Sequence, residues 1–157
     1  METTLHAPAD TAAPVKEDAP ALWNPTAAVL WSLLFSPALG AWLIMRNWER
    51  LGERVNARQA RFWFVGLLAI QVLNAIVVTV GVLLEREIGL PWWVGLLMWA
   101  AWIVLSAYPH ISHVEDGQGE HYPRQSWALP LLIAVAAHLA LPVLAGVATG
   151  IQAATGA

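Results

Sequence analysis

The sequence contains no cysteine and carries few charges. Without thiols, disulfide bonds, thiolate metal sites and cysteine nucleophiles are all excluded. Charged residues make up only 12% of the 157 residues, whereas a soluble domain has roughly 25%. This is too little charge to cover a water-facing surface. No basic cluster resembles the electrostatic footprint of a nucleic-acid-binding protein, so we expect no nucleic-acid partner.

Catalytic signatures are missing as well. The sequence has no nucleophile elbow, no glycine-rich phosphate loop and no metalloprotease motif. We therefore expect a protein that is not an enzyme, that has no catalytic residues and that carries no cofactor.

Apolar residues, by contrast, are abundant. They form 58% of the chain, the mean hydropathy is +0.55, and there are 10 tryptophans. Four stretches contain no Asp, Glu, Lys or Arg and have about the 20 residues that a transmembrane helix needs. These stretches are 22–45, 62–84, 88–108 and 127–147. The predicted fold is all-α, a polytopic membrane protein with four transmembrane helices.

The chain ends differ in composition from the apolar region. Residues 1–20 are rich in Ala, Pro and Thr and contain no apolar run, which indicates a disordered tail rather than a signal peptide. We expect residues 21–150 to form the four-helix transmembrane domain and residues 151–157 to form a flexible C-terminal end.

Arginines between the first two apolar stretches predict the orientation. Cytoplasmic loops carry an excess of Lys and Arg, so this loop and the loop at 109–126 are expected in the cytoplasm and both termini outside. Four-residue spacing puts most of these arginines on one ridge of an amphipathic helix, interrupted near Gly52. They fix topology and contact anionic lipid, or form a dedicated lipid or protein-binding surface. The arginines are Arg46, Arg50, Arg54, Arg58 and Arg61.

Small and polar residues recur every four positions in the first apolar stretch. On a single helix they would form one packing face, because small side chains let membrane helices approach closely. Pro37 then predicts a bend. The alternative is a re-entrant hairpin that turns at Pro37, which would place the N-terminal tail in the cytoplasm. The residues of this ridge are Asn24, Ala28, Ser32, Ser36 and Gly40.

His138 lies near the middle of the fourth stretch. An ionisable residue at that depth is rare and marks a candidate functional site. Polar residues at a similar depth on other stretches predict a cluster at the centre of the bundle. It is either structural hydrogen bonding between helices or a site for a solute, a proton or a quinone-type molecule. The cluster comprises Ser32, Ser36, Gln71, Asn74 and His138.

The loop at 109–126 contains His110, His113 and His121 close to carboxylates, which makes them weak candidates for metal ligands. Pro109 and the sequence DGQG favour a solvated loop over a preorganised helix. We therefore predict no metal site.

Two segments resemble a family of small bacterial inner-membrane proteins with four spans. They are NPTAAVLWSLLFSPALGAWLIMRNWERLG at 24–52 and YPRQSWALPLLIA at 122–134. The resemblance implies a multi-pass protein of the bacterial inner membrane and supplies no reaction.

The leading functional prediction is a non-enzymatic scaffold or accessory protein in the lipid bilayer. It would act through a membrane-protein partner, through lipid or through self-association as a homo-oligomer. The alternative is a small transporter or channel that uses the polar cluster around His138.

Overall fold

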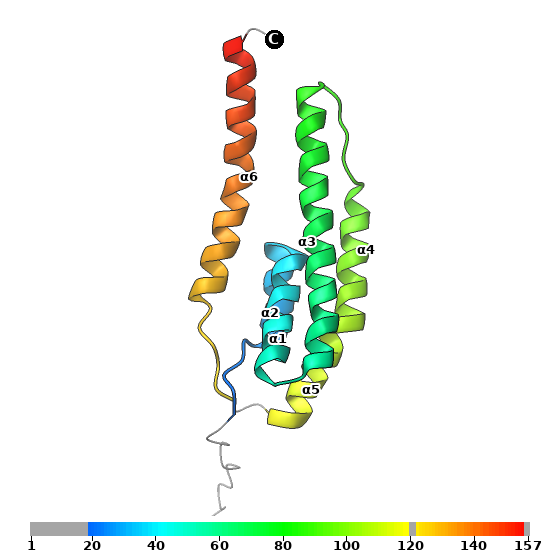
Figure 1. The fold of residues 1–157 in the computed structure, drawn as a ribbon, viewed down its shortest axis with the longest axis vertical. Coiled ribbons are helices and arrows are strands. Elements are labelled where there is room, and N and C mark those ends of the chain that lie inside the picture. The colour runs from blue at the N-terminus through cyan, green and yellow to red at the C-terminus, as the bar shows by residue number, and fades with distance from the viewer. Residues whose placement is uncertain (1–18, 120–121, 156–157) are drawn as a thin grey trace, which may run out of the picture.

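The computed structural model describes residues 19–119 and 122–155, which are helical apart from short connections and one isolated β-bridge (Figure 1). Residues 1–18 of the predicted tail and residues 156–157 lie outside the described chain. The predicted domain end at 150 does not coincide with a helix end, because the last helix continues to Thr155. The elements are α1 (Pro25–Leu34), α2 (Pro37–Arg50), α3 (Arg54–Leu83), α4 (Trp92–Trp102), the π-helical turn η1 (Ile103–Ala107), α5 (Tyr108–Gln118) and α6 (Ala128–Thr155).

The first apolar stretch forms a hairpin of two antiparallel helices, α1 and α2 (Figure 1). Ser36 is the N-cap of α2, and its Oγ accepts a hydrogen bond from the Leu39 backbone N–H at 3.2 Å. Pro37 suits the first position of a new helix, where its missing N–H is not needed. The prediction of one bent helix is therefore wrong, and the alternative hairpin turning at Pro37 is confirmed.

The two helices of the hairpin approach each other closely at Gly40. A Cβ at Gly40 would lie 2.6 Å from the Ser32 Cβ and 3.1 Å from the Ala28 carbonyl oxygen. Three residues of the predicted ridge, Ala28, Ser32 and Gly40, thus pack α1 against α2, whereas Asn24 and Ser36 cap the two helices. In a continuous helix, Ser32 and Gly40 would be about 12 Å apart at a rise of about 1.5 Å per residue.

The arginine-rich segment does not form a helix of its own. Its first part ends α2 and its last part begins α3, with Gly52 at φ 77° in the turn between them. Trp48 and Ala57, on either side of the turn, are both buried in the core, so both flanks belong to bundle helices. The prediction of a separate amphipathic loop helix is wrong, whereas the interruption at Gly52 is confirmed.

The segment expected to begin a loop at Pro109 continues as helix. Residues Trp92–Gln118 form one continuous helical rod through α4, η1 and α5. Pro109 lies at the start of α5, directly after η1. In a regular α-helix the proline ring would clash with the carbonyl four residues earlier, and the wider π-helical turn relieves that clash. The rod ends at Gly119, which has φ 65°.

Within the part of the chain that the structure describes, two helices are long and apolar enough to cross a membrane. They are α3, with 30 residues, and the rod Trp92–Gln118, with 27 residues. Only 11% of the most apolar stretch of α3 is buried, whereas the core helix of a soluble protein would be mostly buried. Helices α1 and α2, with 10 and 14 residues, are each shorter than the roughly 20 residues that a span requires. Hence four spans are not seen.

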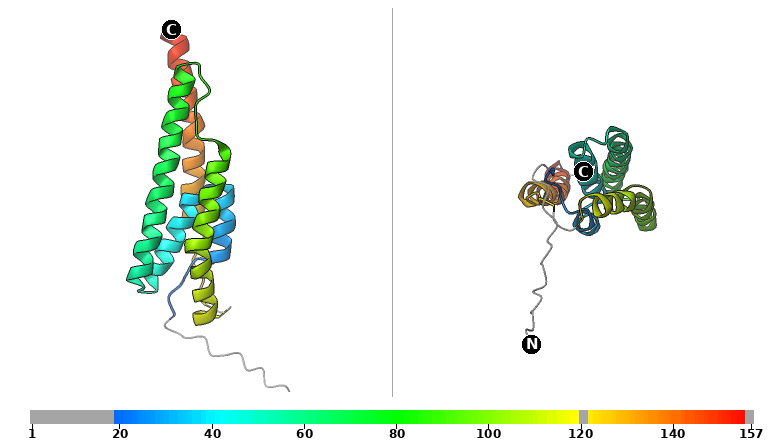
Figure 2. Two further views of the ribbon diagram at one scale, coloured as in Figure 1. Left: turned by 90° about the vertical axis from the view of Figure 1, so that its right-hand side faces the viewer. Right: turned by 90° about the horizontal axis from the view of Figure 1, so that it is seen from below.

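The chain entering α1 and the chain entering α6 meet at the end of the bundle that carries the α2–α3 turn, called here the basal end (Figures 1 and 2). Leu22 N–H donates to the Pro123 carbonyl at 3.0 Å, and Gln125 N–H donates to the Leu22 carbonyl at 2.9 Å. From there α6 runs to the opposite end of the molecule (Figure 1). The described chain therefore begins and ends at opposite ends of the molecule, and the prediction that both termini lie outside is not confirmed.

Candidate functional site

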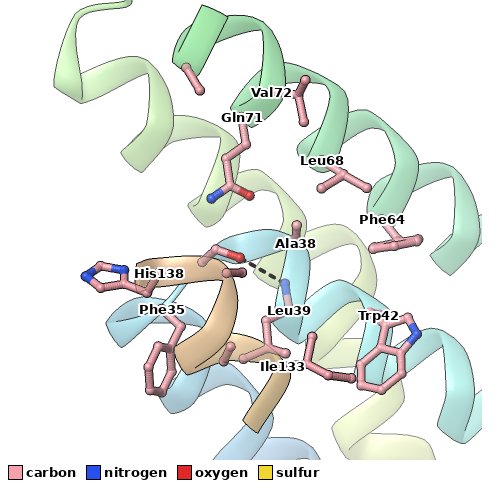
Figure 3. A pocket seen from close by; sticks show the side chains of 14 residues that line it. Phe35, Ala38, Leu39, Trp42, Phe64, Leu68, Gln71, Val72, Ile133 and His138 are labelled. Carbon is pink, nitrogen blue, oxygen red and sulfur yellow. Dashed lines mark hydrogen bonds between the residues drawn. The ribbon is translucent and has the colours of Figure 1, made fainter. Parts of the chain in front are cut away.

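A cavity of about 530 Å³ opens between the tip of the α1–α2 hairpin, α3 and α6 (Figure 3). We call it the hairpin groove. Its walls are aliphatic and aromatic, with Phe35, Trp42 and Phe64 as the aromatic members. Its polar members are Ser36, Gln71 and His138.

The polar members lie near half the thickness of a bilayer. Gln71 is about 15 Å beyond Arg61 along α3, and His138 is about 16 Å beyond Trp127 along α6, at about 1.5 Å per residue. The hydrocarbon layer of a membrane is about 30 Å thick. If arginines and tryptophans mark one interface, these side chains lie close to the midplane.

The hairpin groove collects three of the five residues predicted as a central cluster. Figure 3 shows the Gln71 amide extending from α3 toward the hairpin tip. The His138 ring lies beside Phe35 of the tip, with ring centroids 6.5 Å apart and an edge-on geometry. The tip of the hairpin thus contacts α6 at His138, and Ser36 and His138 of the predicted cluster line the same groove.

Gln71 and His138 have no hydrogen-bond partner within the described chain, and both side chains are exposed. In water this would be unremarkable. At the depth of lipid chains, an amide or imidazole without a partner is unfavourable, because hydrocarbon offers no donor or acceptor. The groove therefore presents two polar side chains to which a bound molecule can form hydrogen bonds.

Ser32 and Asn74 lie outside the groove, so the five-residue cluster is wrong in these two members. Ser32 Oγ accepts a hydrogen bond from Trp99 Nε1 at 2.9 Å, because the hairpin turns this residue toward α4. Asn74 Oδ1 accepts a hydrogen bond from the Leu90 backbone N–H at 2.8 Å. The connection between α3 and α4 folds back along α3, and this return brings Leu90 to Asn74.

A second polar group, the basal latch, consists of Asn47, Trp23 and His110. Asn47 Oδ1 accepts from Trp23 N–H at 3.0 Å, and Asn47 Nδ2 donates to the Trp23 carbonyl at 2.7 Å. The same Nδ2 lies 3.2 Å from His110 Nε2, which therefore acts as an acceptor. Asn47 and His110 are fully buried. Asn47 was not predicted as a functional residue, because the sequence carries no signal that an asparagine in an arginine-rich segment is buried.

Two of the three candidate metal ligands pack against an aromatic ring beside the basal latch. His110 and His113 both contact the ring of Trp48, at centroid distances of 4.5 and 4.8 Å. Across 19–119 and 122–155, no three His, Asp or Glu side chains are grouped as a metal site would need. His121 lies outside the described residues. His110 lies in α5 and contacts Asn47 of the basal latch, so it is not part of the solvated loop that was predicted.

Three of the five arginines make side-chain hydrogen bonds within the described chain, and two do not. Arg50 Nη1 donates to the Ala21 carbonyl at 2.7 Å, and its guanidinium lies 4.5 Å from the Trp23 ring centroid. Arg61 and Arg46 both donate to Glu49, at 2.8 and 3.0 Å, and these hydrogen bonds lower the pKa of Glu49. The remaining two, Arg54 and Arg58, are exposed and make no such contact within the described chain.

Comparison of the chain with protein-family models, curated proteins and solved structures finds no match. The resemblance of 24–52 and 122–134 to a bacterial inner-membrane family therefore stays a prediction, and function is argued from the geometry alone.

Proposed function

We propose that the chain is a multi-pass protein of the bacterial inner membrane with three spans and one re-entrant hairpin. The spans are α3, the rod Trp92–Gln118 and α6, whose 28 residues include no Asp, Glu, Lys or Arg. The hairpin enters and leaves at the basal end. Helix α1, with 10 residues, rises only about 15 Å, half of the hydrocarbon layer. Six arginines occur in the basal segments, whereas Arg86 alone lies in the connection at the other end. This excess supports a cytoplasmic basal end.

The topology is testable with single cysteines, because the native chain has none. In intact cells, Thr11→Cys and Gln59→Cys should both be protected from an impermeant maleimide, while Glu87→Cys should react. All three should react after the cells are opened. Labelling of Thr11→Cys with protection of Gln59→Cys would restore the four-span arrangement with an external N-terminus.

Within the membrane, the function that the geometry supports best is non-enzymatic binding of a lipid-soluble amphiphile in the hairpin groove. The observation that carries this proposal is a mostly apolar cavity of about 530 Å³ with a few polar side chains. Small-molecule sites typically have about 300–1,000 Å³ and this kind of lining. An apolar chain would occupy the walls, and a hydrogen-bonding group would lie at Gln71 and His138.

The lining of the groove, mostly apolar with a few polar side chains, favours a small amphiphile as its occupant. A scaffold role through a partner protein or self-association would use the outer faces of α3, α4 and α6. The transporter alternative needs a continuous polar path, and the groove lining beyond Ser36, Gln71 and His138 is apolar.

Filling the groove should abolish binding. Ala137 and the adjacent Ala136 are both exposed, but of the two only Ala137 lines the groove. We expect Ala137→Trp to reduce labelling of the groove by a diazirine-bearing palmitic acid in proteoliposomes several-fold, because the indole would occupy space that the acyl chain needs. Ala136→Trp, the matched control on the same helix, should label as the native protein does.

The labelled positions are mapped by mass spectrometry of proteolytic peptides. Labels are expected on the parts of α3 and α6 that line the groove. Even labelling of all lipid-facing surfaces, unchanged by Ala137→Trp, would contradict binding in the groove.

A further inference from the structure

A separate pocket lies at the basal end, in the turn between α2 and α3. Its volume is about 310 Å³. It is lined by Glu49, Gly52, Arg54, Ala57, Arg58 and Arg61. We propose that this pocket, called here the arginine pocket, binds the phosphate group of an anionic lipid headgroup. It does not depend on what occupies the hairpin groove.

The charges in the arginine pocket do not balance. Glu49 is its one carboxylate, and it is already shared by Arg61 at 2.8 Å and by Arg46 at 3.0 Å. Arg54 and Arg58 have no anionic partner in the described chain. Two guanidinium groups are thus free to donate to an anion, and guanidinium groups bind phosphate oxygens in a bidentate manner.

The helical spacing brings these arginines together. Arg54, Arg58 and Arg61 are separated by four and three residues on α3, so they project from one face over two turns. Gly52, at the floor of the turn, has a positive φ, and no atom lies within 4 Å of the place where a Cβ would stand. The turn therefore leaves the pocket open between α2 and α3.

The surroundings of Arg58 indicate a lipid rather than a soluble phosphate. Val55 and Phe62 lie three residues before and four residues after it, on the same side of α3, and are 68% and 74% exposed. Exposed apolar side chains on both sides of a free arginine are stable where headgroups meet acyl chains. A soluble anion site would have no use for them.

The test uses the full chain in a non-ionic detergent and native mass spectrometry. The probes are dioctanoyl-phosphatidylglycerol, the zwitterionic dioctanoyl-phosphatidylcholine, and inorganic phosphate as a competitor. We expect the anionic lipid to bind more tightly than the zwitterionic one, with an advantage that shrinks as salt rises. Arg54→Gln and Arg58→Gln should each weaken anionic lipid binding by about five-fold.

Arg86→Gln is the matched control, since it removes one exposed arginine at the opposite end of α3. It should leave anionic lipid binding unchanged. Circular dichroism should show native helix content for all three variants, because these side chains make no contact that the fold needs. Equal binding of both lipids, or equal losses in Arg86→Gln and Arg58→Gln, would overturn the proposal. Displacement of the lipid by millimolar inorganic phosphate would reassign the pocket to a soluble anion.

Discussion

Replacing Gly40 by leucine is expected to prevent the α1–α2 hairpin from closing. A Cβ at this position would lie 2.6 Å from the Ser32 Cβ and 2.6 Å from the Trp102 ring. Trp102 is fully buried, and the Ala28 backbone lies on a third side, so none of these neighbours can move away freely. Even a few extra methylenes in a packed core cost about 1–3 kcal/mol, and leucine adds four carbon atoms.

The expected result is loss of cooperative melting for Gly40→Leu and a marked decrease in melting temperature for Gly40→Ala. Both can be followed by circular dichroism of the detergent-purified protein. Gly66 of α3 is the control, because no atom lies within 4 Å of its Cβ position. Gly66→Ala should be neutral or stabilise α3 by up to about 1 kcal/mol. Native melting of Gly40→Leu would mean that the two helices do not approach as described.

Replacing Asn47 by leucine is expected to release the chain that enters α1 from the rest of the basal end. Leucine has a similar size but offers no hydrogen bonds, so the Trp23 N–H, the Trp23 carbonyl and His110 Nε2 all lose their partner. Each buried polar group left without a partner costs about 1–3 kcal/mol. The expected destabilisation is therefore about 3 kcal/mol or more.

Hydrogen exchange measured by mass spectrometry can locate this effect. Backbone amides around Trp23 should exchange much faster in Asn47→Leu, together with a lower melting temperature. Asn56→Leu is the control, because Asn56 makes only one long contact, 3.5 Å, to Glu53. If both variants exchange alike around Trp23, the basal latch does not hold the hairpin.

Much of the fold is readable from the sequence because hydrophobicity and charge vary along it so strongly. The absence of charge over 62–84 identifies the apolar part of α3, and Gly52 is recognisable as a helix break among the arginines. The helical state of 109–118 was not readable, because Pro109 is tolerated only through the π-helical turn before it. A turn of that kind has no sequence signal of its own.

The first apolar stretch shows a feature of the fold that residue spacing alone could not predict. Its small residues and Pro37 led to the prediction of a bent span, but a hairpin buries the same side chains. Contacts between distant residues decide for the hairpin: Ser32 against Gly40, and Trp23 against Asn47. Such contacts depend on how helices rotate and return, and residue spacing alone does not specify this.

The same division applies to the candidate site. Residue types and their depth along each helix follow from the sequence, and they identified Ser36, Gln71 and His138 as polar groups within apolar stretches. Depth can be counted at a constant rise per residue, but the direction that each side chain faces cannot. Tertiary packing brought these three to one groove and turned Ser32 and Asn74 to other partners. Helix composition is a local property, whereas a binding site requires several helices to meet in one orientation.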